Sequence, residues 1–160
     1  MIAVILISAG VFALCAALRR RLSGSAPRFL FRDKIQLDPM YNRGAAFGLN
    51  LKGPVLNVLS AAALGMLALL AASARGLLAR LGAGLALGGG LSNLYERLRG
   101  RGVLDYLRFP RLPGRVKRLV FNAADLAIFA GLLLMLLDGG KNIPADAILK
   151  HGGDHLDDVI

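Results

Sequence analysis

Long apolar stretches separated by shorter polar segments dominate the pattern of hydrophobic and polar positions along the chain. There are four of them, at Met1–Leu18, Val55–Ala74, Leu77–Tyr95 and Val120–Leu137. Each is close to the roughly 20 residues that an α-helix needs to cross the hydrocarbon of a bilayer. The pattern therefore predicts a membrane protein with four transmembrane helices, of which the third is interrupted by Arg80.

The polar segment between the first two stretches, Leu22–Pro54, contains repeated turn signals such as Asp38-Pro39 and Gly53-Pro54. Two pieces of it, Arg28–Arg32 and Lys34–Leu37, have enough Phe, Ile and Leu for short strands. We expect them to form a small β-cradle at the membrane surface. The predicted fold class is thus an all-α membrane protein with a β-cradle in the loop between helices 1 and 2.

Residues 1–138 are expected to form one membrane domain, and residues 139–160 a flexible polar tail rich in Gly and Asp. The very short loop before Leu77 makes the second and third stretches an antiparallel hairpin. Glycines in the third stretch let helices approach closely in lipid, and for Gly82 and Gly84 close packing is the role we expect.

Composition supports the membrane assignment, because 56% of the residues are hydrophobic and there is no Trp. The first stretch could instead be a cleaved signal peptide. However, the basic cluster Arg19–Arg21 follows the apolar run rather than preceding it, so we expect a retained span. The single Cys15 excludes an intrachain disulfide and is expected to act as a small apolar side chain facing lipid or a neighbouring helix.

The net charge of +10 is concentrated in two segments. Eight of the 20 Lys and Arg residues lie between Arg19 and Lys52, and eight more between Arg97 and Arg118. Basic stretches of this kind can bind nucleic acid, but beside four apolar spans they favour contact with membrane phospholipid. We therefore expect a phospholipid partner and no nucleic acid.

Acidic residues are scarce between Met40 and Leu137, where only Glu96, Asp105 and Asp125 occur. An acid within a span is costly and usually faces a polar interior or a substrate path. Asp125 lies near the head of the fourth stretch, with Asn122 three residues earlier on the same predicted helical face. If Asp105 lies close by in a partly dry place, the two carboxylates become an acid and a base that can share a water.

Two further groups of polar residues could serve this site. Asn93, Glu96 and Arg97 end the third stretch on one helical face, and Arg97 could fix Asp105 or hold the carbonyls of a substrate peptide. Asn42 and Gly44, among small residues, suggest a close approach of the backbone to something bound. The alternatives are that Arg97 reaches lipid headgroups, that Asp105 pairs with a neighbouring arginine and that Asp125 reaches water.

Four motifs stand in order along the chain: Asn42-Arg43-Gly44-Ala45-Ala46-Phe47, Gly88-Gly89 through Asn93-Leu94-Tyr95-Glu96-Arg97, Val103-Leu104-Asp105-Tyr106, and Phe121-Asn122-Ala123-Ala124-Asp125. Over about Asp33 to Leu137 the chain resembles the lipoprotein signal peptidases, the signal peptidase II family of bacterial membrane aspartic peptidases.

This resemblance implies four membrane helices with an extracytoplasmic β-cradle, in the bacterial cytoplasmic (inner) membrane. The substrates would be lipid-modified prolipoproteins, cleaved just before the diacylglyceryl-Cys. By motif position Asp105 and Asp125 would be the catalytic dyad, with Asn42, Gly44, Asn93, Arg97 and Asn122 as supporting residues. No metal or other cofactor is implied, and we expect a monomer.

Three features depart from the family pattern. The first span lacks the family's Asp, since the matching region reads Leu14-Cys15-Ala16-Ala17-Leu18-Arg19. Glu96 stands where the family has Asp. The basic segments also lie in the loops that the family places outside, against the positive-inside rule. A divergent paralogue with another substrate or none therefore stays open.

Two other functions are compatible with the sequence alone. A small four-span transporter could use Asp125 for proton coupling. A metal could bind His151 and His155 with the acids of the tail, although a terminal segment is a weak setting for such a site.

Overall fold

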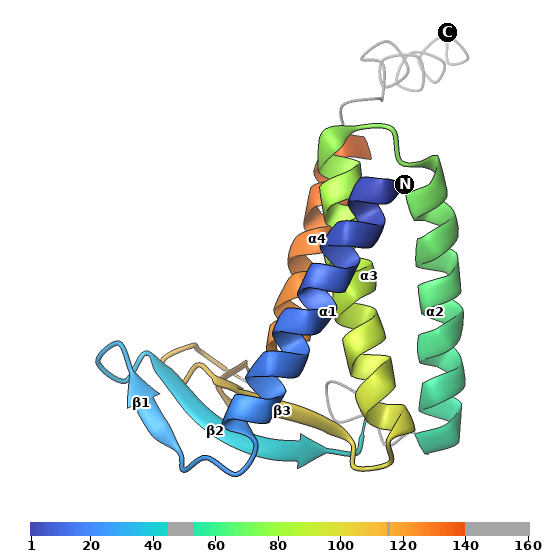
Figure 1. The fold of residues 1–160 in the computed structure, drawn as a ribbon. Helices are drawn as coiled ribbons and strands as arrows, with labels where there is room; N and C mark the ends of the chain where they lie inside the picture. Colours follow the sequence, from blue (N-terminus) through green and yellow to red (C-terminus); the bar gives the residue numbers. More distant parts are fainter. Residues whose placement is uncertain (45–52, 115, 140–160) are drawn as a thin grey trace, which may run out of the picture.

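The computed structural model describes residues 1–44, 53–114 and 116–139, and within them helices stand on end over a small antiparallel sheet (Figure 1). The helices are α1 (Ile2–Leu22), α2 (Gly53–Ser73), α3 (Leu77–Leu98) and α4 (Ala123–Gly139), with a short 3-10 helix, η2 (Val116–Arg118). The four long helices match the four apolar stretches. The expected tail lies outside the described residues from position 140 onward.

Two of these helices, α1 and α2, are long and apolar enough to cross a membrane. Only 17% and 11% of their most apolar windows are buried in the protein, so they are not core helices of a soluble domain. On α4, Phe129 and Leu136 are each 72% exposed. Outward apolar faces of this kind support a mostly helical membrane fold.

The sheet consists of β1 (Arg28–Leu30), β2 (Ile35–Asn42), β3 (Val103–Arg108) and β4 (Val120–Phe121), in that spatial order and antiparallel throughout. Both strands expected between the first two helices are present, and the second continues to Asn42. The cradle is not confined to that loop, however. Its other two strands come from the segment between α3 and α4, so the sheet joins both basic loops at one end of the bundle (Figure 1).

The start of α4 differs from the prediction, which began the span at Val120. Val120 and Phe121 pair with β3 as β4, and the helix begins at Ala123 after Asn122. Asp125 therefore lies in the first helical turn. Asn122, which was expected on the same helical face, instead precedes the helix.

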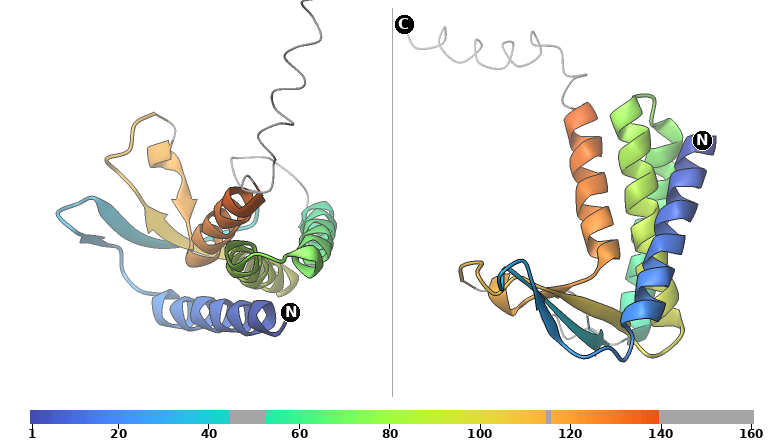
Figure 2. Two further views of the ribbon diagram at one scale, coloured as in Figure 1. Left: turned by 90° about the horizontal axis from the view of Figure 1, so that it is seen from above. Right: turned by 60° about the vertical axis from the view of Figure 1, so that its left-hand side comes forward.

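Glycines bring α3 against two neighbours, and Figure 2 shows α3 packed among the other helices. A Cβ at Gly82 would meet the carbonyl of Gly131 on α4, and one at Gly84 would lie 2.7 Å from Ile7 on α1. The role expected for both glycines is confirmed, because only the absence of a side chain permits this approach. Cys15 is buried, as expected of a small apolar side chain.

Candidate active site

Asp105 lies in the middle of β3 and is 5% exposed. Both of its carboxylate oxygens accept hydrogen bonds from asparagine amides. Asn42 Nδ2 donates to Oδ2 at 2.9 Å, and Asn122 Nδ2 donates to Oδ1 at 2.8 Å. The pairing of β2 with β3 explains how Asn42 reaches Asp105. Asn42 is opposite Val103, two residues before Asp105 on β3, so it is a diagonal neighbour of Asp105 on the same face of the sheet.

The orientation of both amides is fixed by backbone N–H groups. Gly44 N donates to Asn42 Oδ1 at 2.9 Å, and Asp125 N donates to Asn122 Oδ1 at 2.9 Å. Since each amide oxygen is occupied by a donor, each amide nitrogen is left to point at Asp105. The role of Gly44 is therefore to hold Asn42 through its backbone.

Asp125 is held at the N-terminus of α4 by a reciprocal cap. Asn122 N donates to Asp125 Oδ2 at 3.0 Å, while Asn122 Oδ1 accepts from Asp125 N. This is the capping-box arrangement of N-cap and N3 residues, and the positive end of the helix macrodipole favours a carboxylate there. The free-energy cost of an acid at the head of an apolar span is therefore lower at Asp125 than the sequence suggests.

The second oxygen of Asp125 is held by α3, where Asn93 Nδ2 donates to Oδ1 at 2.8 Å. One turn before Asn93, Gly89 lets α3 approach the head of α4, since a Cβ at Gly89 would lie 2.5 Å from the carbonyl of Ala124. Gly89 and Asn93 share a helical face at the i, i+4 spacing. The close glycine contact thus sets the distance at which Asn93 meets Asp125.

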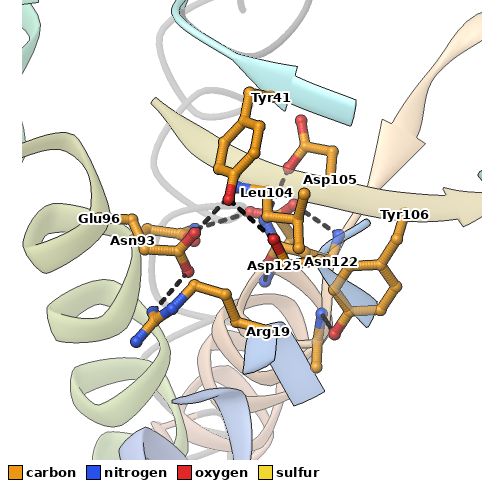
Figure 3. A network of polar contacts seen from close by, with 11 residues as sticks. Arg19, Tyr41, Asn93, Glu96, Leu104, Asp105, Tyr106, Asn122 and Asp125 are labelled. Carbon is orange, nitrogen blue, oxygen red and sulfur yellow. Dashed lines mark hydrogen bonds and ion pairs between the residues drawn. The ribbon is translucent and has the colours of Figure 1, made fainter. Parts of the chain in front are cut away.

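Asn122 joins the two carboxylates. Its side chain donates to Asp105 and its backbone N–H to Asp125, so one residue ties β3 to the head of α4. Figure 3 shows Asp105, Asn122, Asp125 and Asn93 in one cluster. The structure therefore brings together Asp105 and Asp125, the pair selected from the sequence, with Asn42, Asn93 and Asn122 bonded directly to them.

Burial raises the pKa of Asp105 from 3.8 to about 6, against the opposing effect of the amides of Asn42 and Asn122. The negative charge of Asp125 also raises this pKa, and the positive charge of Arg97 lowers it. A carboxyl group with this pKa can exist in either protonation state near neutral pH. It is suited to proton transfer.

Arg97 is close enough to act on Asp105 through its charge, but it forms no ion pair with either carboxylate within the described residues. The expectation that it fixes Asp105 directly is therefore wrong. Its Nε is buried without a hydrogen-bond partner among the described residues, and the same holds for Oδ1 of Asn93. These two atoms belong to side chains one turn apart on α3.

Tyr106 takes part in the site in a way that the sequence analysis did not recognise. Its hydroxyl oxygen accepts the N–H of Ala123 at 3.0 Å and so holds another of the free donors at the head of α4. Burial raises its pKa to about 12, which keeps the phenol neutral. No local signal in the sequence marks this contact, although Leu104 and Tyr106 both pack in the core with Leu22 and Leu37.

Glu96 also has a defined role beside the site (Figure 3). Its Oε2 accepts the N–H of Leu104 at 2.9 Å, and its Oε1 lies 3.1 Å from Nη1 of Arg19 on α1. Both side chains are largely buried. Glu96 therefore anchors the peptide group next to Asp105 and ties α3 to α1.

No group of three or more His, Cys, Asp or Glu side chains suited to a metal occurs in the part of the chain that the structure describes. His151 and His155, the metal candidates of the tail, lie outside it.

Comparison with known proteins gives consistent matches over most of the chain. The sequence profile of the family described as Signal peptidase (SPase) II matches residues 2–139. A lipoprotein signal peptidase of Chlorobium luteolum is 31% identical over 121 residues, which are 70% of this chain and 72% of that protein. A lipoprotein signal peptidase of Desulfitobacterium hafniense is 39% identical over 117 residues, 68% of this chain and 74% of that protein.

Two solved structures share the fold. Each is described as a bacterial membrane enzyme studied by the in meso method, one at 2.3 Å and one at 1.9 Å resolution. The first superposes with a TM-score of 0.74 at 18% identity and covers 98% of this chain and 93% of its own. The second has a TM-score of 0.75 at 19% identity, with 87% and 93% covered.

Proposed function

Because the chain belongs to the signal peptidase II family, we propose that Asp105 and Asp125 are the catalytic dyad with which it cleaves lipoprotein signal peptides. The observation that carries this proposal is the bridge through Asn122, which holds the two carboxylates in one cluster. The chain is a peptidase, and the substrate bond is the one before the diacylglyceryl-Cys of a lipid-modified prolipoprotein.

The proposed chemistry needs only the two carboxyl groups and a water. The ionised carboxylate accepts a proton from the water, whose oxygen then attacks the scissile carbonyl carbon. The protonated carboxyl donates its proton to the carbonyl oxygen, which gives a tetrahedral intermediate with two hydroxyl groups. As this intermediate collapses, the carboxyl that took the proton of the water passes it to the departing amine nitrogen, and the other carboxylate takes a proton back from a hydroxyl group. Although each carboxylate oxygen accepts one hydrogen bond, it keeps a second lone pair for water or substrate.

The surrounding residues have separate tasks in this proposal. Asn42, held by Gly44, and Asn122 aim Asp105, while Asn93 aims Asp125. The buried Oδ1 of Asn93 and Nε of Arg97 have no partners among the described residues. As an acceptor and a donor one turn apart, they would hold an N–H and a C=O of the substrate peptide once entry of the substrate exposes them. No cofactor has a step in this reaction.

The proposed setting is the bacterial inner membrane, with α1 to α4 as four spans of a monomeric domain covering residues 1–138. The lipid of the substrate would lie against the exposed apolar faces of the helices. The sheet would then lie at the membrane surface, where a peptide can reach β3 from outside the hydrocarbon. Exposed apolar side chains such as Phe129 and Leu136 support this setting.

The test is cleavage of a diacylglyceryl-modified prolipoprotein by the purified full-length protein in proteoliposomes. Asp105→Asn and Asp125→Asn should each lower the rate by at least about a hundredfold, the scale of general acid–base catalysis. The matched control is Asp33→Asn, because Asp33 is exposed in the β1–β2 turn at φ 63, a conformation that Asn tolerates. Cleavage at the parent's rate by either dyad variant would rule out the proposed roles.

A further inference from the structure

A second polar site borders Glu96. It is an open cavity of about 490 Å³, at the end of the bundle where α1 and α3 finish. Its charged lining consists of four arginines and one carboxylate, namely Arg19, Arg20, Arg99, Arg101 and Glu96. Neither dyad carboxylate, nor any asparagine bonded to it, is among the described residues that line the cavity.

The arginines are incompletely neutralised. Arg19 pairs with Glu96, but no carboxylate of the described residues lies within 4.0 Å of Arg20, Arg99 or Arg101. Part of this basic surplus offsets the negative ends of the α1 and α3 macrodipoles. That effect does not require the four groups to converge on one cavity, where their mutual repulsion favours a bound anion.

Two of the guanidinium groups are held in place. Arg19 and Arg99 lie over the ring of Tyr95, with centroid distances of 5.5 and 5.0 Å. Stacking on an aromatic ring uses the face of the guanidinium and leaves its N–H groups at the edge for an acceptor. A fork of this kind matches the oxygens of a phosphate group, which Arg binds through paired hydrogen bonds.

The surroundings of the cavity favour a lipid headgroup over a free phosphate ion. Apolar side chains on the same helices remain exposed, with Leu14 at 58% and Leu98 at 66%, so an acyl chain could lie below the arginines. Tyr41, an aromatic side chain of the kind found at membrane surfaces, also lines the cavity and bonds Ser23 at 3.1 Å. We propose that this cavity binds the phosphodiester headgroup of an anionic phospholipid.

This assignment gives a reason for the basic residues that run against the positive-inside rule. Four of them, Arg19, Arg20, Arg99 and Arg101, line the lipid site at the sheet end of the bundle. The proposal does not depend on the peptidase activity, since Asp105→Asn should leave lipid binding unchanged.

The test is native mass spectrometry of the full-length protein in a nonionic detergent, titrated with short-chain phosphatidylglycerol or phosphatidylcholine. The test variant is Arg20→Gln combined with Arg101→Gln. Its matched control is Arg21→Gln with Arg111→Gln, which changes two exposed arginines that do not line the cavity. The parent should bind phosphatidylglycerol about tenfold more tightly than phosphatidylcholine, and the test variant should lose this preference while the control keeps it.

Equal binding of the two lipids by the parent, or an unchanged preference in the test variant, would overturn the proposal. A competition experiment adds inorganic phosphate to the protein with its bound lipid, and chloride at the same ionic strength is the reference. Displacement of the lipid by phosphate at a concentration comparable to that of the lipid would mean that the cavity takes the free anion, and would overturn the assignment to a lipid.

Discussion

Asn122 donates its side-chain amide to Asp105 at 2.8 Å, and the backbone of the following helix determines which end of that amide faces the carboxylate. The amide oxygen is occupied by the N–H of Asp125, so rotation of the amide would break two hydrogen bonds at once. One residue thus caps α4 and orients Asp105. These two tasks can be separated by substitution.

Asn122→Asp should keep the cap and damage the orientation of Asp105. Asp caps helices about as well as Asn, but it places a carboxylate oxygen where the amide donor was. We expect the cleavage rate to fall by about a hundredfold, the usual loss when one preorganised donor is removed. The pKa of Asp105 should rise above about 6, because a second charge is added and a donor is lost.

Asn122→Ala supplies the comparison, since it removes the cap as well and should cost about 1 kcal/mol of stability. The measurements are the pH profile of cleavage and thermal unfolding of both variants. Parent-like cleavage by Asn122→Asp would show that the donor to Asp105 is dispensable.

Stability should depend on pH through Asp105. Its pKa is 3.8 unperturbed and about 6 in the folded protein, so between these values the folded state binds more protons than the unfolded state. Stability from this group is therefore fully present below pH 3.8 and is lost as the pH rises through about 6. The shift in the pKa of Asp105 corresponds to a change of roughly 3 kcal/mol at most in the free energy of unfolding.

The measurement is the melting temperature of the parent minus that of Asp105→Asn, followed from acid to neutral pH. Taking the difference removes the titration of the other acids. We expect this difference in melting temperature to decrease as the pH rises. A difference that stays constant or increases would mean that the pKa of Asp105 is not raised.

The helices and the acidic pair could be predicted from the sequence because both leave local signals. Apolar runs of near-membrane length are visible in one dimension, and Asp105 and Asp125 stand out where acids are scarce. The strand Val103–Arg108 was harder to identify. Its first four residues are buried in succession, so it lacks the alternation that distinguishes a strand from a short apolar linker.

The remaining differences come from signals that were read incorrectly or were absent. Asn122 and Asp125 have the spacing of a capping box, which resembles the spacing of two residues on one helical face. The pairing of Arg19 with Glu96 depends on how α1 packs on α3, and nothing local in the sequence marks it. Such long-range partners become visible only once the helices are packed.

Glu96 should tolerate loss of charge better than loss of length. Glu96→Gln can still accept the N–H of Leu104, but it leaves Arg19 without a counter-charge. Because Arg19 is 20% exposed, we expect Glu96→Gln to lower the free energy of unfolding by about 1 kcal/mol, which is less than the cost of breaking a fully buried pair. Glu96→Asp, the residue expected of the family here, is one methylene too short to hold both partners.

Cleavage distinguishes the two Glu96 variants. If Glu96 positions the peptide next to Asp105, then Glu96→Asp should lose more activity than Glu96→Gln, at substrate concentrations that saturate both. The half-buried pair of Asp38 and Arg108 is the control, and Asp38→Asn should cost at most about 1 kcal/mol of stability and leave the cleavage rate unchanged. Equal activity of the two Glu96 variants would leave Glu96 with a structural role only.

Gly89→Ala should reduce activity by separating two helices. The new Cβ would lie 2.5 Å from the carbonyl of Ala124, which is backbone and cannot swing away, so α3 and the head of α4 must move apart. The hydrogen bond from Asn93 to Asp125, one turn further along α3, is 2.8 Å long and would lengthen with this movement. We also expect the free energy of unfolding to fall by about 1–3 kcal/mol, as for other overpacked interiors.

Gly10→Ala and Gly65→Ala are matched controls, since a Cβ at either position has nothing within 4 Å. Both lie within helices, where Ala is favoured over Gly by roughly 0.5–1 kcal/mol, so these variants should melt at or above the parent's temperature. Thermal unfolding and prolipoprotein cleavage are measured on all three. If Gly89→Ala melts lower but cleaves at the parent's rate, then the contact of α3 with α4 stabilises the bundle without setting the position of Asp125.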